Sequence, residues 1–166
     1  MTKPEKAGGY MELKPIGIIH SPYKEKKDSP RQGRFSDNLA VIEVFDEYTA
    51  GLKNVETLTN LFVLYWGDRS DRNVLQSVTP FGPEITGVFS SRSPNRPNPI
   101  ALCIVDVISV EGNKLTVRGL DALDGSPLLD IKAYSGSLDS IPDAQIGWQS
   151  SKDDRPEKAN GGDGLA

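Results

Sequence analysis

The sequence has little of what builds disulfide frameworks or metal sites, because its 166 residues include one cysteine and one histidine. A lone cysteine, Cys103, excludes a disulfide within the chain, and its position in an apolar run favours a core residue over a reactive thiol. His20 follows two isoleucines and has no partner at metal-ligand spacing. We therefore expect no metal site, and a structural rather than catalytic role for His20.

Long apolar segments are also lacking. The longest run, from Leu61 to Trp66, is far shorter than the roughly 20 residues that a membrane-spanning helix needs. The N-terminus does not show the basic-then-apolar pattern of a signal peptide. The expectation is a cytoplasmic protein without a membrane segment.

Nucleotide-binding motifs and helical periodicity are missing as well. Nothing resembles GxGxxG after a strand, GxxxxGK[ST] or GxSxG, so a Rossmann-type nucleotide site is not expected. Apolar residues instead come in short runs separated by Gly, Pro, Asn and Asp, which is typical of many short strands. The length suits one domain.

The runs predict six strands and little helix. The Gly112-Asn113 pair between two of the runs predicts a β-hairpin turn. Short helical pieces are expected near Glu47 to Leu52 and Glu56 to Asn60. The expected strands are Ile16 to His20, Leu39 to Phe45, Leu61 to Trp66, Ala101 to Val110, Leu115 to Leu120 and Leu128 to Tyr134.

The two ends of the chain differ in composition from the middle. Residues 1–10 are polar with two adjacent glycines, and residues 150–166 are charged and glycine-rich. Such segments bury too little apolar surface to stay ordered alone. We predict a mainly β, compact single-domain barrel over residues 11–149, with short helical connections and flexible ends.

The segment from Arg92 to Ile100 holds three prolines and two arginines in nine residues. Each proline restricts its own φ and the conformation of its predecessor, so we predict a rigid loop, neither helix nor central strand. Arg92 and Arg96 could aim planar guanidinium forks at a carboxylate or phosphate. A stiff surface connection whose arginines pair with nearby acids is the alternative.

Two further segments carry suitable side chains. Residues 119–134 include Asp121, Asp124 and Asp130, whose carboxylates could hold ribose hydroxyls or an ammonium group, or could simply form turns. Residues 24–34 contain five basic residues in eleven positions. Because the net charge is −4, an RNA substrate would have to meet this local patch rather than a broad basic field. A solvated loop is its alternative reading.

Taken together and in order, these segments resemble the TrmO-like tRNA methyltransferase family over about residues 13–149. The resemblance implies a β-barrel-like domain outside the common methyltransferase fold, which binds S-adenosylmethionine and commonly forms a homodimer. It implies N6-methylation of threonylcarbamoyladenosine at position 37 of tRNA. The matching marks are Ile16 to Tyr23, Pro30-Arg31-Gln32, Gly87-Val88-Phe89, Arg92-Ser93, Arg96 to Ile100, Leu120-Asp121 and Asp124 to Lys132.

Carried over position by position, the resemblance also implies the cofactor-binding residues. Arg31 or Arg92 would hold the cofactor carboxylate, Asp121 or main-chain groups of its turn would hold polar parts, and Leu102 and Leu123 would flank the adenine. Relatives often carry an aromatic and a histidine where this chain has Asp68 and Arg69. The full set is Pro30, Arg31, Gln32, Asp68, Arg69, Arg92, Leu102, Leu120, Asp121, Ala122 and Leu123.

The sequence does not identify a residue that assists loss of the acceptor proton. Tyr65, Asp124 and Lys132 are candidates of similar weight, and positioning alone could supply much of the rate. The alternatives are a non-catalytic S-adenosylmethionine-binding module and a methyltransferase with another acceptor. Many bacterial relatives continue into a further C-terminal domain, whereas this chain corresponds to a short form.

Overall fold

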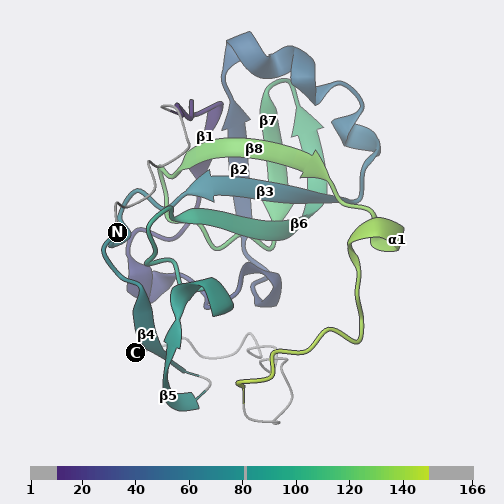
Figure 1. Cartoon of the computed structure of the whole chain (residues 1–166). Helices are drawn as coiled ribbons and strands as arrows, with labels where there is room; N and C mark the ends of the chain where they lie inside the picture. Colours follow the sequence, from purple (N-terminus) through teal and green to yellow (C-terminus); the bar gives the residue numbers. More distant parts are fainter. Residues whose placement is uncertain (1–10, 81, 150–166) are drawn as a thin grey trace.

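The computed structural model describes residues 11–80 and 82–149. Within these residues, six strands close into an antiparallel barrel in the order β1-β2-β7-β6-β3-β8, and two more form a separate hairpin (Figure 1). The barrel strands are β1 Gly17–His20, β2 Leu39–Val44, β3 Asn60–Trp66, β6 Ile100–Glu111, β7 Lys114–Arg118 and β8 Pro127–Ala133. The hairpin, here called the arm, consists of β4 Gln76–Thr79 and β5 Gly82–Gly87.

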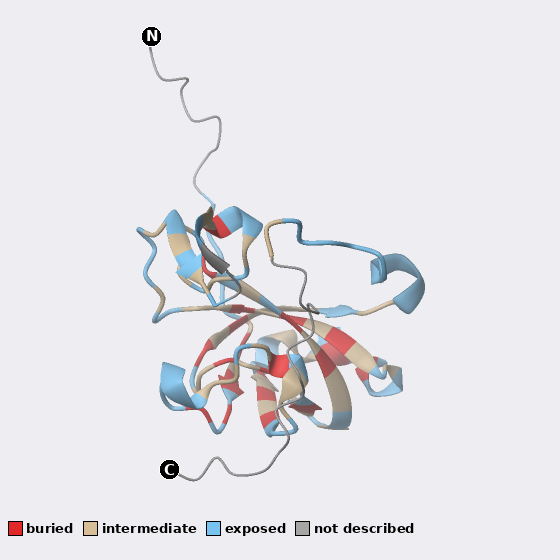
Figure 2. Ribbon diagram, turned by 90° about the horizontal axis from the view of Figure 1, so that it is seen from below, coloured by how far each residue is buried: buried red, intermediate tan, exposed pale blue. Residues whose placement is uncertain are grey.

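The barrel interior is filled by alternate residues of each strand. In β3, Leu61, Val63 and Tyr65 are buried while their neighbours are only partly covered. This alternation follows from the two-residue period of a strand, and each fully buried Leu or Ile contributes about 1.5–3 kcal/mol. Figure 2 shows the buried residues along the barrel strands. The central core residues are Ile19, Ile42, Val44, Leu61, Val63, Val105, Leu115, Val117, Leu120 and Leu128.

The prediction of a mainly β barrel outside the Rossmann class is confirmed. All six expected strands form, and β6 and β7 pair through a turn in which Gly112 has φ +60°. The expected helical pieces are 3-10 helices, η3 Asp46–Leu52 and η4 Val55–Thr57. The other short helices are η1 Lys26–Asp28, η2 Gly33–Phe35, η5 Val88–Ser90 and α1 Gly136–Asp139.

The arm was not expected from the sequence. Pro80 and Gly82 interrupt its short apolar stretches, and its pairing shifts register between Val78 and Thr79. In Figure 1 the arm projects from the barrel. Four of the large hydrophobic side chains on or next to it are exposed, and they belong to Leu75, Val78, Ile85 and Phe89. The indole of Trp148 returns to this region and donates to the Ser90 carbonyl at 2.9 Å.

Two connections meet at one end of the barrel. Residues 119–126, here called the closing turn, place the side chains of Leu120 and Ala122 in the core. Residues 21–35, here called the basic loop, lie against them. Ser21 Oγ donates to the Ala122 carbonyl at 2.7 Å, and Asp124 N donates to the Tyr23 carbonyl at 2.7 Å. The barrel therefore carries two segments, distant in sequence, side by side.

The contact between the two segments depends on a glycine. A Cβ on Gly33 would lie 2.1 Å from the carbonyl oxygen of Gly119, so no larger residue fits without moving backbone. Gly119 itself has φ +101°, a conformation that favours glycine. This close approach fixes where the basic loop sits on the closing turn.

The predicted flexible ends, 1–10 and 150–166, lie outside the described residues. Of the helices that are described, none is long and apolar enough to cross a membrane.

Candidate functional site

The carboxylate of Asp121, on the closing turn, receives two hydrogen bonds from barrel strands. Tyr65 Oη on β3 donates to Oδ1 at 2.7 Å, and Cys103 Sγ on β6 donates to the same oxygen at 2.9 Å. Among the described residues, no side chain or main-chain group donates to Oδ2. The carboxylate is therefore held through one oxygen, and the other has no protein donor among these residues.

Both donors retain their protons at neutral pH. Burial raises the pKa of Tyr65, and the charge of Asp121 raises it further. Burial and the same carboxylate raise the pKa of Cys103, with a smaller opposing effect from Arg92. Tyr65 is thus a hydrogen-bond donor and does not fit the role of proton acceptor. The expectation of a core cysteine agrees with the buried position of Cys103.

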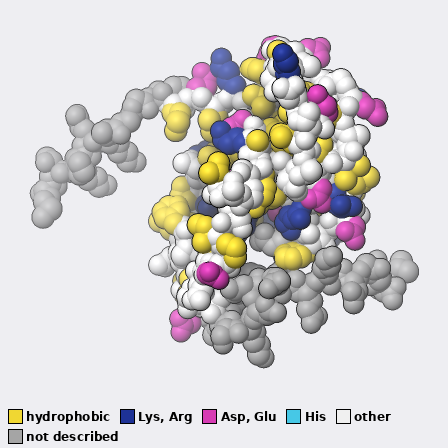
Figure 3. All heavy atoms as spheres, turned by 90° about the vertical axis from the view of Figure 1, so that its right-hand side faces the viewer, with side chains coloured by type: hydrophobic (Ala, Val, Ile, Leu, Met, Phe, Trp, Pro, Cys, Tyr) yellow, Lys and Arg dark blue, Asp and Glu magenta, His cyan; other side chains and the backbone are white. Residues whose placement is uncertain are grey.

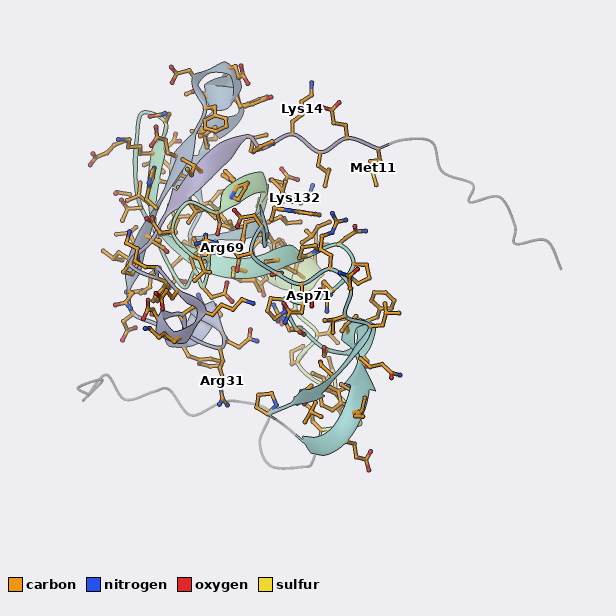
Figure 4. All side chains as sticks on the ribbon, turned by 90° about the vertical axis from the view of Figure 1, so that its left-hand side faces the viewer. Met11, Lys14, Arg31, Arg69, Asp71 and Lys132 are labelled. Atoms are coloured by element: carbon orange, nitrogen blue, oxygen red, sulfur yellow. The ribbon has the colours of Figure 1, made fainter. Side chains whose placement is uncertain are left out.

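The segment Pro30-Arg31-Gln32 is placed beside Asp121 by its neighbour. Ser29 Oγ donates to the main-chain carbonyl of Asp121 at 2.6 Å. The Gln32 carbonyl accepts from Phe35 N and so begins η2. Arg31 is exposed, and Figure 4 shows it pointing away from the barrel.

The two arginines of the proline-rich loop have different partners. Arg96 donates to the carbonyls of Ser93 at 2.9 Å and Ser91 at 2.7 Å, and also to that of Val88. Through Nε and Nη2 it therefore holds its own loop. Arg92 donates through Nη2 to the Leu102 carbonyl at 3.0 Å. Neither arginine forms an ion pair with an acid in the described structure.

Arg92 and Leu102 belong to the same neighbourhood as Asp121. Leu102 precedes Cys103 on β6, and its side chain is 46% exposed on the outer face of that strand. Because Arg92 donates to the carbonyl of Leu102, its guanidinium lies beside the part of β6 that carries the thiol bonded to Asp121.

The closing-turn residues on either side of Asp121 can contribute mainly main-chain groups to the site. Leu120 and Ala122 are 2% and 0% exposed, so their side chains serve the core and only their main-chain groups can face a ligand. Leu123 is half-buried, and its carbonyl accepts from Ser126 Oγ at 2.6 Å. Asp121 is therefore the position in residues 120–123 with a polar side chain to offer.

Asp68 and Arg69 follow β3 and reach the far end of the same turn. Arg69 Nη2 donates to the Asp124 carbonyl at 2.8 Å and to Ser126 Oγ at 3.4 Å, and Nε donates to Asp68 Oδ1 at 3.3 Å. The pair links β3 to the closing turn. Among the described residues, no hydrogen bond or ion pair joins Asp68 or Arg69 to Asp121 or Arg92, so the two lie at the margin of the site.

The other candidates for proton removal are engaged in ion pairs. Asp124 accepts from Lys24 at 2.5 Å and from Ser21 N at 3.0 Å, and these two hydrogen bonds lower its pKa. It fixes the closing turn on the basic loop. Lys132 is exposed and pairs with Asp130 at 3.1 Å on β8.

The basic loop presents less free charge than its sequence indicates. Lys24, Lys27 and Arg34 pair with Asp124, Glu25 and Asp106 respectively. On the face shown in Figure 3, basic and acidic side chains are interspersed.

The single histidine lies near the surface, where His20 Nε2 forms a hydrogen bond of 2.8 Å with Glu43 Oε2. Within the described residues, no three His, Cys, Asp or Glu side chains gather as metal ligands would.

Fold and site together define a small β-barrel protein in which a carboxylate held by two barrel residues lies where two connections meet. Residues 18–140 match the family described as tRNA-methyltransferase O N-terminal domain, and the chain belongs to this family. It is 54% identical over 131 residues to the S-adenosyl-L-methionine-binding protein of Archaeoglobus fulgidus, covering 79% of this chain and 94% of that protein.

Longer relatives share the same part. The mouse tRNA (adenine(37)-N6)-methyltransferase is 32% identical over 84% of this chain, which corresponds to 34% of the mouse protein. The crystal structure of TrmO from Pseudomonas aeruginosa is 29% identical with a TM-score of 0.71, covering 84% of this chain and 62% of that one. The chain thus spans less than two thirds of these two relatives.

Proposed function

We propose that this protein binds S-adenosylmethionine at the barrel end and methylates N6 of threonylcarbamoyladenosine at position 37 of tRNA. The observation that carries the proposal is the Asp121 carboxylate, which Tyr65 and Cys103 hold by one oxygen beside the Pro30–Gln32 segment. The names of the archaeal and mouse relatives support the cofactor and the reaction, respectively.

The side chains at this site fit the cofactor chemically. S-adenosylmethionine presents a carboxylate, an ammonium group, a ribose diol and an adenine. Asp121 has a free carboxylate oxygen for the ammonium or the diol, and Arg92 has guanidinium N–H groups beyond the one that binds Leu102. The exposed Leu102 side chain and the half-buried Leu123 offer apolar surface for the base. Arg31 is the second candidate for the cofactor carboxylate.

The chain contributes to the reaction mainly by positioning. When bound, S-adenosylmethionine supplies an electrophilic methyl group on a sulfonium. Asp121 and Arg92 orient the ligand, and the rigid loop held by Arg96 keeps Arg92 in place before binding. Because Tyr65 keeps its proton and Asp124 and Lys132 are paired, we assign the rate to alignment rather than to a dedicated base.

A non-catalytic S-adenosylmethionine-binding module is the second candidate. It is favoured by the engagement of Tyr65, Asp124 and Lys132 in other contacts, and by the names of the archaeal relatives. A methyltransferase with another acceptor would use the same cofactor site. These readings differ in whether, and where, a methyl group is transferred.

We further propose a homodimer that acts on tRNA in the cytoplasm. The exposed apolar side chains on and next to the arm, including Ile85 and Phe89, form the surface that a second copy would cover. A cyclic two-fold pair is the commonest assembly of identical chains.

Mass spectrometry of tRNA nucleosides tests the proposed reaction. The protein is incubated with cofactor and with tRNA that carries the threonylcarbamoyl group but lacks the N6-methyl, and an Asp121→Asn variant serves as the control. Methylated threonylcarbamoyladenosine is expected with the wild type and much less with the variant. Cofactor binding without methyl transfer across several tRNA pools would instead support the binding module.

A further inference from the structure

A cavity lies next to the closing turn, lined by residues that the cofactor proposal does not use. Its volume is about 300 Å³, and it is lined by residues 34–37, Asp106, Arg118 and Gly119. Arg34 follows the Pro30–Gln32 segment by two positions, and Gly119 directly precedes Leu120. The lining of the cavity thus lies close in sequence to both proposed cofactor segments.

Asp106 holds the two arginines of this cavity in fixed positions. Arg34 Nη1 donates to Oδ1 at 2.8 Å, and Arg118 Nε donates to Oδ2 at 3.2 Å. Asn60 Nδ2 adds a bond of 2.8 Å to Oδ1. Partial desolvation would raise the pKa of Asp106, but the bonds from Arg34, Arg118 and Asn60 outweigh it and the pKa is lowered. Both guanidinium groups are therefore oriented before any ligand arrives.

The charges of the lining indicate what kind of ligand fits. Arg34 and Arg118 are balanced by Asp37 and Asp106, so the lining does not favour a bare phosphate. Asp37 is exposed and forms no ion pair among the described residues. Free guanidinium N–H groups and a free carboxylate suit a neutral ligand that has both acceptors and donors at its edge.

Phe35 supplies an aromatic ring on which such a ligand could stack. It lines the cavity and is half-buried, and it lies between Arg34 and Ser36 in the segment that packs on Gly119. Aromatic rings and guanidinium planes are the platforms on which proteins stack unpaired nucleobases, whose edges then form hydrogen bonds. A cavity of about 300 Å³ has room for one base.

We propose that this cavity receives one unpaired base of the RNA substrate, distinct from the base that is methylated. The inference rests on the proposed function, because it assumes that RNA is the substrate. Phe35 stacks on the base, while Asp37 and the two arginines pair with its edge. The cavity thereby places the loop of the RNA beside the cofactor segments.

Equilibrium binding of two RNA probes tests the inference. The probes are a tRNA anticodon stem-loop, which has unpaired bases, and a blunt duplex of the same length. A Phe35→Leu variant keeps apolar volume but loses the aromatic face, and we expect about tenfold weaker binding of the stem-loop with unchanged binding of the duplex. Phe45→Leu, at a partly exposed phenylalanine outside the cavity, is the matched control.

An Asp37→Asn variant separates base recognition from phosphate attraction by the sign of its effect. Removal of a negative charge strengthens phosphate-driven binding. If Asp37 accepts hydrogen bonds from a base, the variant instead binds the stem-loop several-fold more weakly. Glu111→Gln makes the same charge change at an exposed position outside the cavity.

Cofactor affinity is measured by calorimetry on the same variants and is expected to stay unchanged. Equal stem-loop affinity of Phe35→Leu and wild type, or stronger binding by Asp37→Asn, overturns the inference while leaving the proposed function intact. A parallel loss of cofactor affinity overturns it by assigning the cavity to the cofactor. A wild-type protein that binds no RNA overturns the proposed function and the inference with it.

Discussion

Tyr65 and Asp121, 56 residues apart in sequence, are joined by a hydrogen bond of 2.7 Å from the tyrosine hydroxyl to Oδ1. The bond ties the end of β3 to the closing turn. Cys103 adds a second donor to the same oxygen at 2.9 Å. The site therefore depends on two side chains that belong to the barrel wall, and several of its properties can be tested there.

Tyr65→Phe removes one of the two donors to the carboxylate. Because hydrogen bonds to charged groups contribute about 1.5–3 kcal/mol, we expect the free energy of unfolding to fall by an amount in that range. Urea denaturation measures it. Tyr134→Phe is the control, because no side-chain hydrogen bond of that tyrosine occurs in the described structure. Equal stability of the two variants would contradict the assigned role.

Gly33→Ala tests the contact between the basic loop and the closing turn. The added Cβ would lie 2.1 Å from the Gly119 carbonyl oxygen, so backbone must move. We expect a loss of about 1–3 kcal/mol or more in unfolding free energy, together with weaker cofactor binding. Gly51→Ala, where a Cβ meets nothing within 4 Å, should change neither. A Gly33→Ala protein with wild-type cofactor affinity would show that this contact does not shape the site.

The raised pKa of Cys103 leads us to expect a lower free energy of unfolding in mild alkali. Its folded pKa is raised above the unfolded value of about 8.5, so above that pH the unfolded state binds fewer protons than the folded state. Stability then falls with rising pH, by up to about 1.4 kcal/mol per unit for one group. Cys103→Ser keeps a donor but does not ionise, and its stability should fall less between about pH 8.5 and 9.5. Parallel pH profiles would contradict the prediction.

The exposed apolar side chains on and next to the arm lead to a prediction about the homodimer. If a second copy covers its apolar side chains, an Ile85→Ser, Phe89→Ser double variant should be monomeric at concentrations where light scattering shows a wild-type dimer. Leu138→Ser, at an exposed leucine on α1, is the control and should remain dimeric. A monomeric wild type, or a double variant that stays dimeric, would contradict the proposed surface.

The barrel could be predicted from the sequence because each of its strands has a recognisable local sequence pattern. The short apolar runs and the Gly112-Asn113 turn determine β6 and β7 without knowledge of the rest of the fold. The arm could not, because Pro80 and Gly82 break its pattern and none of its described hydrophobic side chains packs on the barrel core. Propensity is a weak guide for strands whose apolar faces stay exposed.

The site was predicted as a set of segments, but its internal contacts were not. Pro30–Gln32, Arg92 and Asp121 were expected to share one cofactor site. In the structure Ser29 donates to the Asp121 carbonyl, and Arg92 donates to the Leu102 carbonyl on β6. The donors Tyr65 and Cys103 lie 56 and 18 residues from Asp121, and only barrel closure places them there. Likewise, nothing in the sequence distinguishes Arg96, which binds its own loop, from Arg92.

The most direct test of the account is calorimetric titration of S-adenosylmethionine into the wild type and an Arg92→Ala, Asp121→Ala double variant. Arg96→Ala serves as a comparison that disturbs the loop without removing a proposed ligand group. Binding by the wild type with a loss of at least about tenfold in the double variant is predicted, since each lost charge-assisted hydrogen bond contributes about 1.5–3 kcal/mol. Unchanged affinity in a folded double variant would contradict the assignment of the cofactor to the Asp121 cluster.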